Sequence, residues 1–135
     1  MVPPIPDEFS EMNEARAARR RLVEAGADQL PPLPWQPAAG PPDDISLLRF
    51  AMWRANSVVG AASHDELAAA LRLVESARAD LDALEAGLIL IARAEGMTWP
   101  DIARPLGVKS PQAAQQRYQR VSSRTQDSND PGLPE

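Results

Sequence analysis

The chain has 135 residues, a formal net charge of −5 and no cysteine, so disulfides, thiolate nucleophiles and cysteine-based metal sites are excluded. Its richness in Ala and Leu, with only six aromatic residues, predicts a single domain of the all-α class. No run approaches the roughly 20 apolar residues of a membrane span, and the N-terminus lacks the regions of a signal peptide. We therefore expect a cytoplasmic protein with no membrane partner.

Residues 1–43 are predicted to form an extended, proline-rich N-terminal arm that contains one helix over residues 8–25. Asp7 is suited to cap this helix and Gly26 to end it. Phe9, Met12, Leu22 and Val23 form only a thin apolar stripe. The helix is therefore expected to be marginal alone, or to form only against a partner.

A proline-rich linker is predicted over residues 30–42, which hold six of the fourteen prolines. Its composition favours a polyproline-like spacer with Trp35 packed onto the body. The alternative is that the arm is a docking ligand for a protein partner.

Residues 44–80 are expected to be a helical dimerisation or interaction region. Asp43 and Asp44 are suited to cap a helix over residues 45–59, with Ile45, Leu48, Met52 and Val59 on one stripe. Phe50 and Trp53 would then lie beside or behind this stripe.

A second helical pattern begins with a capping box at Ser63 and Glu66 and runs without Gly or Pro to Ala86, or through Gly87 to Glu95. Asp80 and Asp82 are a candidate break, with a new helix starting near Leu81. If unbroken, the helix has about 31 residues and a length of ~47 Å.

A helix of that length needs more cover than this small chain offers. Its leucines recur at spacings of three, four or seven, so we expect a homodimer built on residues 45–90. The alternative is a monomer in which helices 45–59 and 64–90 form an antiparallel hairpin.

Residues 81–124 carry the most specific pattern of the chain. A supporting helix over residues 81–95, with Leu84, Leu88, Ile91 and Ala92 facing inwards, ends at Gly96. Thr98 caps a short helix whose core positions are Ile102, Ala103 and Leu106, and Gly107-Val108 supplies a tight turn. Pro105 is unusual so close to the end of this helix.

The next helix begins at Ser110-Pro111 and is predicted to bury Ala114, Tyr118 and Val121. A 100° step per residue places Gln112, Gln116, Gln119 and Arg120 opposite, with Gln115 on one flank and Arg117 and Arg124 on the other. Gln is suited to adenine and Arg to guanine in the major groove. Lys109, Ser110, Arg117 and Arg124 are better placed for phosphates, and Thr98 and Arg104 for the backbone from the first helix.

This stretch resembles the helix-turn-helix DNA-binding superfamily, and among its members the small bacterial regulators. The resemblance rests on Trp99, Ile102-Ala103, Leu106-Gly107-Val108, and Gln112-Ala113-Ala114 through Arg117-Tyr118. It covers about 45 residues. The Lys109-Ser110-Pro111 turn is one residue longer than the commonest spacing, which leaves the register of the base contacts open by one residue. The resemblance implies that the second helix enters the DNA major groove.

Charge separates this region from the rest of the chain. Between Arg93 and Arg124 six cations face two carboxylates, a net charge of +4, so the remainder carries −9. We expect a dimeric, sequence-specific, double-stranded DNA-binding protein, a transcriptional regulator or a small nucleoid-type factor. The alternative is a helical protein-interaction module that uses the acidic body and the proline-rich arm.

No enzymatic site is expected. The single histidine, His64, lies at a helix start without partner ligands, and Asp80 and Asp82 point to different sides of a helix. We predict no cofactor and no metal. The tail, residues 125–135, is expected to be disordered.

Overall fold

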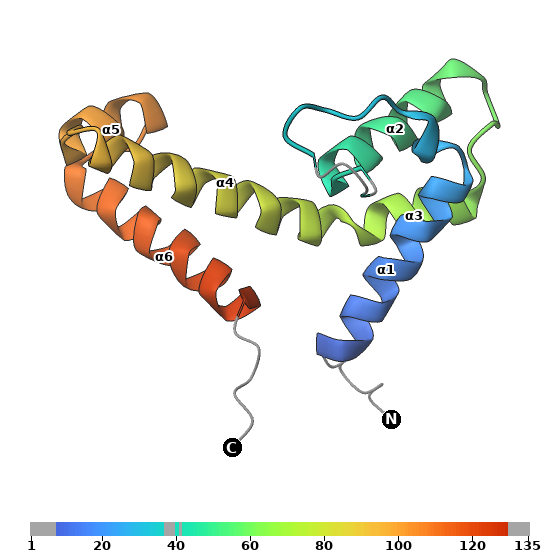
Figure 1. Ribbon diagram of the computed structural model, residues 1–135, viewed down its shortest axis with the longest axis horizontal. Helices are drawn as coiled ribbons and strands as arrows, with labels where there is room; N and C mark the ends of the chain where they lie inside the picture. The colour runs from blue at the N-terminus through green and yellow to red at the C-terminus, as the bar shows by residue number, and fades with distance from the viewer. Residues whose placement is uncertain (1–7, 37–39, 41, 130–135) are drawn as a thin grey trace. The chain divides into compact units, whose positions relative to one another are not determined.

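The computed structural model describes residues 8–36, 40 and 42–129, and within them the chain is helical, with no strand (Figure 1). The elements are α1 (Glu8–Glu24), the 3₁₀ helix η1 (Ala27–Gln29), α2 (Asp44–Ser57), α3 (His64–Arg72), α4 (Val74–Ala94), α5 (Trp99–Leu106) and α6 (Pro111–Asn129). Two compact units divide the chain, Met1–Ala77 (unit 1) and Arg78–Glu135 (unit 2), and the boundary falls inside α4. The predicted all-α class is confirmed.

Unit 1 has a core to which every one of its helices contributes. Its fully buried large side chains are Leu22 of α1, Leu47 of α2 and Leu73, which follows α3. Ala18, Ala27, Phe50, Ala51 and Ala69 complete this core. Because α1 packs on α3 and α2, the chain from Glu8 onward is part of the body rather than a separate arm.

Helix α1 begins and ends close to the predicted residues, but the residues that it buries differ from those predicted. Gly26 stops the helix with φ +125°, and η1 follows directly. Ala18 and Leu22 are buried, whereas Phe9 and Met12 are exposed. Packing against α3 buries the middle and the C-terminal half of α1. The small side chain of Ala18 permits a close approach of the two helices. The predicted cap Asp7 lies outside the described residues.

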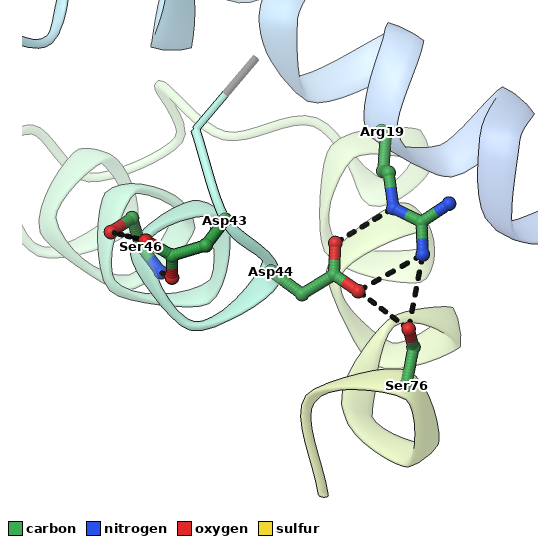
Figure 2. Close-up of polar contacts among 5 residues, drawn as sticks. All are labelled: Arg19, Asp43, Asp44, Ser46 and Ser76. Carbon is green, nitrogen blue, oxygen red and sulfur yellow. Dashed lines mark hydrogen bonds and ion pairs between the residues drawn. The ribbon is translucent and has the colours of Figure 1, made fainter. Parts of the chain in front are cut away.

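A buried polar cluster ties α1, α2 and the start of α4 together (Figure 2). Arg19 donates to both carboxylate oxygens of Asp44, at 2.7 and 3.0 Å, and to the Ser76 hydroxyl at 3.0 Å. The Ser76 hydroxyl in turn donates to Asp44. Burial would raise the pKa of Asp44, but the bonds from Arg19 and Ser76 and the Arg19 charge outweigh it and lower that pKa.

Helix α2 begins as predicted and buries a different face. Asp43 is its N-cap, and its carboxylate accepts a hydrogen bond from the Ser46 N–H at 2.9 Å. The buried residues are Leu47, Phe50 and Ala51, whereas Met52 and Val59 of the predicted stripe are exposed. Asp44 is locked to Arg19, and this contact fixes the rotation of α2 about its axis.

The proline-rich segment also departs from expectation, because Trp35 is 75% exposed rather than packed onto the body. A turn closes here instead, with the Gln36 N–H donating to the Leu33 carbonyl and the Gln36 side chain accepting from the Leu33 N–H. Residues 37–39 and 41 of the predicted linker lie outside the described residues.

The predicted long helix is broken at Leu73, not at Asp80 or Asp82. The Leu73 N–H donates to the Ala70 and Leu71 carbonyls, which tightens the last turn of α3 before α4 begins at Val74. Leu73 is fully buried, and the break lets both Leu73 and Ser76 face the core of unit 1. Ser63 caps α3 as predicted, but the Glu66 carboxylate bonds to Arg54 instead of the cap backbone.

Unit 2 consists of α4 from Arg78, α5 and α6, and its buried apolar residues are Ile89, Ile102, Ala103, Ala114 and Val121. The prediction that Leu84, Leu88 and Ile91 face inwards is wrong, because all three are largely exposed. Ile89 takes the inward position instead. Helix α6 continues to Asn129. Residues 125–129, which were expected to belong to a disordered tail, are therefore helical.

Candidate nucleic-acid interface

The start of α5 is fixed by a reciprocal capping box. The Thr98 hydroxyl accepts from the Asp101 N–H at 3.3 Å, and the Asp101 carboxylate accepts from the Thr98 N–H at 2.9 Å. The same hydroxyl donates to Asp101 at 2.7 Å. The bonds from the Thr98 backbone and side chain lower the pKa of Asp101. The hydroxyl proton of Thr98, predicted to touch a DNA backbone, is thus already directed at Asp101.

The turn between α5 and α6 comprises residues 107–110. Gly107 adopts a left-handed conformation with φ +72°, and the Val108 N–H reaches back to the Ala103 carbonyl at 3.1 Å. This is the glycine-dependent way to satisfy the last carbonyls of a helix. Pro105 lies inside α5, which ends one residue later at Leu106.

Helix α6 is anchored at its N-terminus and along one face. The Ser110 hydroxyl, predicted to contact phosphate, accepts from the Ala113 N–H at 3.0 Å and therefore caps the helix. Ala114 and Val121 are buried and Tyr118 is half-buried, as the 100° step predicts. Tyr118 lies against Trp99 of α5, with ring centroids 6.1 Å apart.

The opposite side of α6 carries exposed polar side chains. We call this set the α6 outer face, and it consists of Gln112, Gln115, Gln116, Gln119 and Arg120. Within the described part of the chain, none of these side chains has a hydrogen bond or an ion pair to another residue. From Pro111 to Arg124 the helix has no carboxylate. This face is therefore open to a ligand that both accepts and donates hydrogen bonds.

The two arginines on the flank are engaged with α4. Arg117 bonds to Glu85, and Arg124 lies 3.1 Å from Asp82. Both were predicted as phosphate contacts, but here they orient α6 against α4. The sequence pattern missed these partners because it gives no distance between residues 32 and 42 positions apart.

Two predicted cations remain exposed beside α6. Arg104 of α5 and Lys109 of the turn have no bonded partner among the described residues, although the charge of Arg104 helps to lower the pKa of Asp101. A further cation, Arg93, was not predicted as part of the site. Its guanidinium lies 5.1 Å from the centre of the Trp99 ring and donates to the Met97 carbonyl at 3.0 Å.

Within residues 8–36, 40 and 42–129, no three His, Asp or Glu side chains gather where a metal ion could be held. In the same part of the chain, no helix is long and apolar enough to cross a membrane.

No family model matches the chain, and no curated protein and no solved structure was found to be similar to it.

Proposed function

We propose that unit 2 binds double-stranded DNA with α6 in the major groove, as a transcriptional regulator or a small nucleoid-type factor. The observation that carries this proposal is the α6 outer face, four glutamines and an arginine that are exposed and without intramolecular partners. Glutamine pairs with adenine and arginine with guanine through two hydrogen bonds each. The capped start at Ser110 and the buried Ala114–Val121 face support a fixed orientation of this helix.

Lys109 and Arg104 are the proposed phosphate contacts, because Lys109 is exposed in the turn before α6 and Arg104 is exposed on α5. Thr98 and Ser110 have a capping role first. Arg117 and Arg124 reach phosphate only if they leave Glu85 and Asp82, so we assign them to the positioning of α6. A homodimer through residues 45–90 completes the proposal, with two copies of α6 in successive major grooves about 34 Å apart.

Selection of bound sequences from random duplex DNA, followed by anisotropy titration at two salt concentrations, tests the proposal. Gln116→Ala and Arg120→Ala should each cost about 1–3 kcal/mol of binding free energy on the selected site and relax the base preference at one position. Gln29→Ala and Arg72→Ala remove the same chemistry from exposed positions of unit 1 and serve as matched controls. The proposal fails if no duplex is selected, or if both α6 variants retain full affinity and preference.

The second candidate function is a helical protein-interaction module, favoured by apolar exposure in unit 1. A hollow of ≈ 350 Å³, lined mainly by apolar atoms, lies between the Leu30–Gln36 segment and α2. Phe50 and Trp53 line it, and Trp53 is largely exposed. Deletion of residues 1–43 is a poor test because it removes Ala18 and Leu22 from the core. Trp53→Ala tests this candidate. A variant that loses a protein partner in a pull-down but retains DNA binding would show that the two functions use different surfaces.

A further inference from the structure

The hollow of unit 1, between the Leu30–Gln36 segment and α2, has one face of α2 as its floor. Arg49, Phe50 and Trp53 follow Ser46 by three, four and seven positions, and all four residues line the hollow. A step of 100° per residue brings these positions onto one side of the helix. The neighbouring side of α2, which includes Leu47, packs into the core of unit 1.

The Leu30–Gln36 segment forms the other side of the hollow, and hydrogen bonds hold it in place. The Gln36 side chain accepts from the Leu33 N–H at 2.8 Å and donates to the Asp43 carboxylate at 3.4 Å. Asp43 is also the N-cap of α2. The turn at Leu33 and the start of α2 are therefore tied together, so the hollow is largely pre-formed, as small-molecule sites usually are.

Two aromatic rings supply the apolar surface of the hollow. Phe50 is buried, and its ring lies so near Gly26 that a Cβ added there would be 3.6 Å from the Phe50 Cζ atom. The Trp53 ring lies 6.2 Å from the Phe50 ring, between centroids, and Trp53 is 66% exposed. Phe50 thus supports Trp53 from the core, and Trp53 offers a large apolar surface to a ligand.

The polar groups that line the hollow differ in whether they already have a partner. Gln36 and Ser46 both bond to Asp43. Arg49 and the indole N–H of Trp53 have no hydrogen bond or ion pair among the residues that the structure describes. Both groups donate hydrogen bonds and do not accept them. The described lining residues include no Asp or Glu, so the unused polar groups of the hollow suit an acceptor with negative charge.

The size and the charge of the hollow restrict the ligand further. Its volume of ≈ 350 Å³ is near the lower end of the range of about 300–1,000 Å³ that small-molecule sites occupy. Arg49 is the only cation among the described lining residues, which is too little charge for a polyphosphate. One guanidinium and an apolar floor instead match one carboxylate on an apolar body, because arginine can bind a carboxylate through two hydrogen bonds.

We propose that the hollow of unit 1 binds a small carboxylic acid, whose apolar chain or ring packs on Phe50 and Trp53 and whose carboxylate pairs with Arg49. Arg49 follows Asp43 by six positions, so the bound carboxylate lies about 9 Å along α2 from the charge of Asp43. The described residues of the site all belong to unit 1, so this inference goes beyond DNA binding by unit 2 and does not depend on it.

A nitrogen–proton correlation NMR titration of the full chain with octanoate and with octanol tests the site. These probes share one apolar chain and differ in charge. Octanoate should shift the indole signal of Trp53, identified by its loss in Trp53→Phe, and leave that of Trp99 in unit 2 unchanged. Octanol should bind about 10-fold more weakly, because it lacks the charge-assisted hydrogen bonds.

Three results of this titration would overturn the inference. The first is a Trp53 signal that millimolar octanoate does not shift, which would leave the hollow to a protein partner. The second is an equal shift of Trp53 and Trp99, which would indicate non-specific binding. The third is equal affinity for octanoate and octanol, which would exclude the pairing with Arg49.

Arg49→Gln isolates the charge, and calorimetric titration measures its effect. This variant should bind octanoate about 10-fold more weakly and octanol as the wild type does. Arg72→Gln removes the same charge from an exposed position of α3 outside the hollow and is the matched control. Equal affinities of Arg49→Gln and wild type for octanoate, or an equal loss in Arg72→Gln, overturns the assignment of Arg49.

Trp53→Ala isolates the apolar contact. Because Trp53 is largely exposed, its removal should leave unit 1 folded, as circular dichroism can verify. Octanoate and octanol should both bind about 10-fold more weakly to this variant, since both lose the same apolar surface. Unchanged affinity for both probes would show that they bind elsewhere.

Discussion

At the scale of single residues, Asp44 concentrates the polar interactions of unit 1. It is buried, it accepts hydrogen bonds from Arg19 and Ser76, and it belongs to the first turn of α2. A carboxylate in this position also interacts favourably with the helix dipole. Three chain segments therefore depend on one negative charge.

The lowered pKa of Asp44 makes unit 1 sensitive to acid. A carboxylate whose folded pKa is below its unfolded value contributes stability above the unfolded pKa, ordinarily 3.8, and loses it as pH falls through the folded pKa. Asp44→Asn should therefore destabilise unit 1 by about 1–3 kcal/mol at pH 7 and flatten the loss of stability below pH 4.

Urea denaturation monitored between pH 7 and 3 measures both effects on Asp44→Asn. Asp28→Asn, an exposed carboxylate of η1, is the control and should leave the curves nearly unchanged. Equal stability of Asp44→Asn and wild type at pH 7 would show that the Arg19 contact has no net effect.

At the scale of elements, the pairs between α4 and α6 determine which arginines are available. Glu85 and Asp82 neutralise Arg117 and Arg124, so only Arg120 of α6 lies free within the outer face. Removal of these carboxylates should release Arg117 towards phosphate and remove one contact of Arg124.

The variant Asp82→Asn with Glu85→Gln should accordingly bind non-specific duplex more tightly and with a steeper salt dependence. Each additional phosphate contact changes the slope of log K against log salt by about 0.9. Glu11→Gln with Asp65→Asn gives the same change in net charge from exposed positions of unit 1 and is the matched control. If both pairs raise affinity equally, net charge alone is responsible.

The same elements show how far sequence reasoning reaches. Caps at Asp43, Ser63, Thr98 and Ser110 are local signals, and the structure has all four. The buried face of α6 was also predictable, since Ala114 and Val121 follow one helical stripe.

Faces that depend on distant partners were not predictable. The leucine spacing of α4 predicted that Leu84 and Leu88 face inwards, but both are exposed and Ile89 is buried instead, because spacing along one helix does not show on which side its partners lie. The rotation of α2 depends on Arg19, 25 residues before Asp44, and the break at Leu73 on burial in unit 1. The proposed base contacts stay a prediction.

At the scale of the whole molecule, the chain has two compact units, each with its own core, and the boundary between the units falls within α4, between Ala77 and Arg78. Leu22→Ala opens a cavity in the core of unit 1 and should cost about 2–5 kcal/mol there. Because the buried residues of that cluster and the partly buried residues packed against it all belong to unit 1, unit 2 should keep its own stability.

Trp99 is the only tryptophan of unit 2, so a Trp35→Phe, Trp53→Phe background reports on that unit alone. In this background, Leu22→Ala should leave the thermal transition of Trp99 fluorescence unchanged while the loss of helix measured by circular dichroism begins earlier. Coincident earlier transitions by both probes would instead indicate one cooperative molecule.

The length of the α6 outer face sets how many places on a chromosome the protein can distinguish. From Gln112 to Arg120 the face extends about 12 Å, at 1.5 Å per residue. That equals the width of the major groove and covers about three or four base pairs per copy. Two copies then specify six to eight positions, or roughly 10⁴–10⁵ sequences, against about 10⁶ or more competing positions in a genome. Under the proposed function, a single dimer matches tens of chromosomal positions or more, which is the distribution of a factor that organises or regulates many loci together.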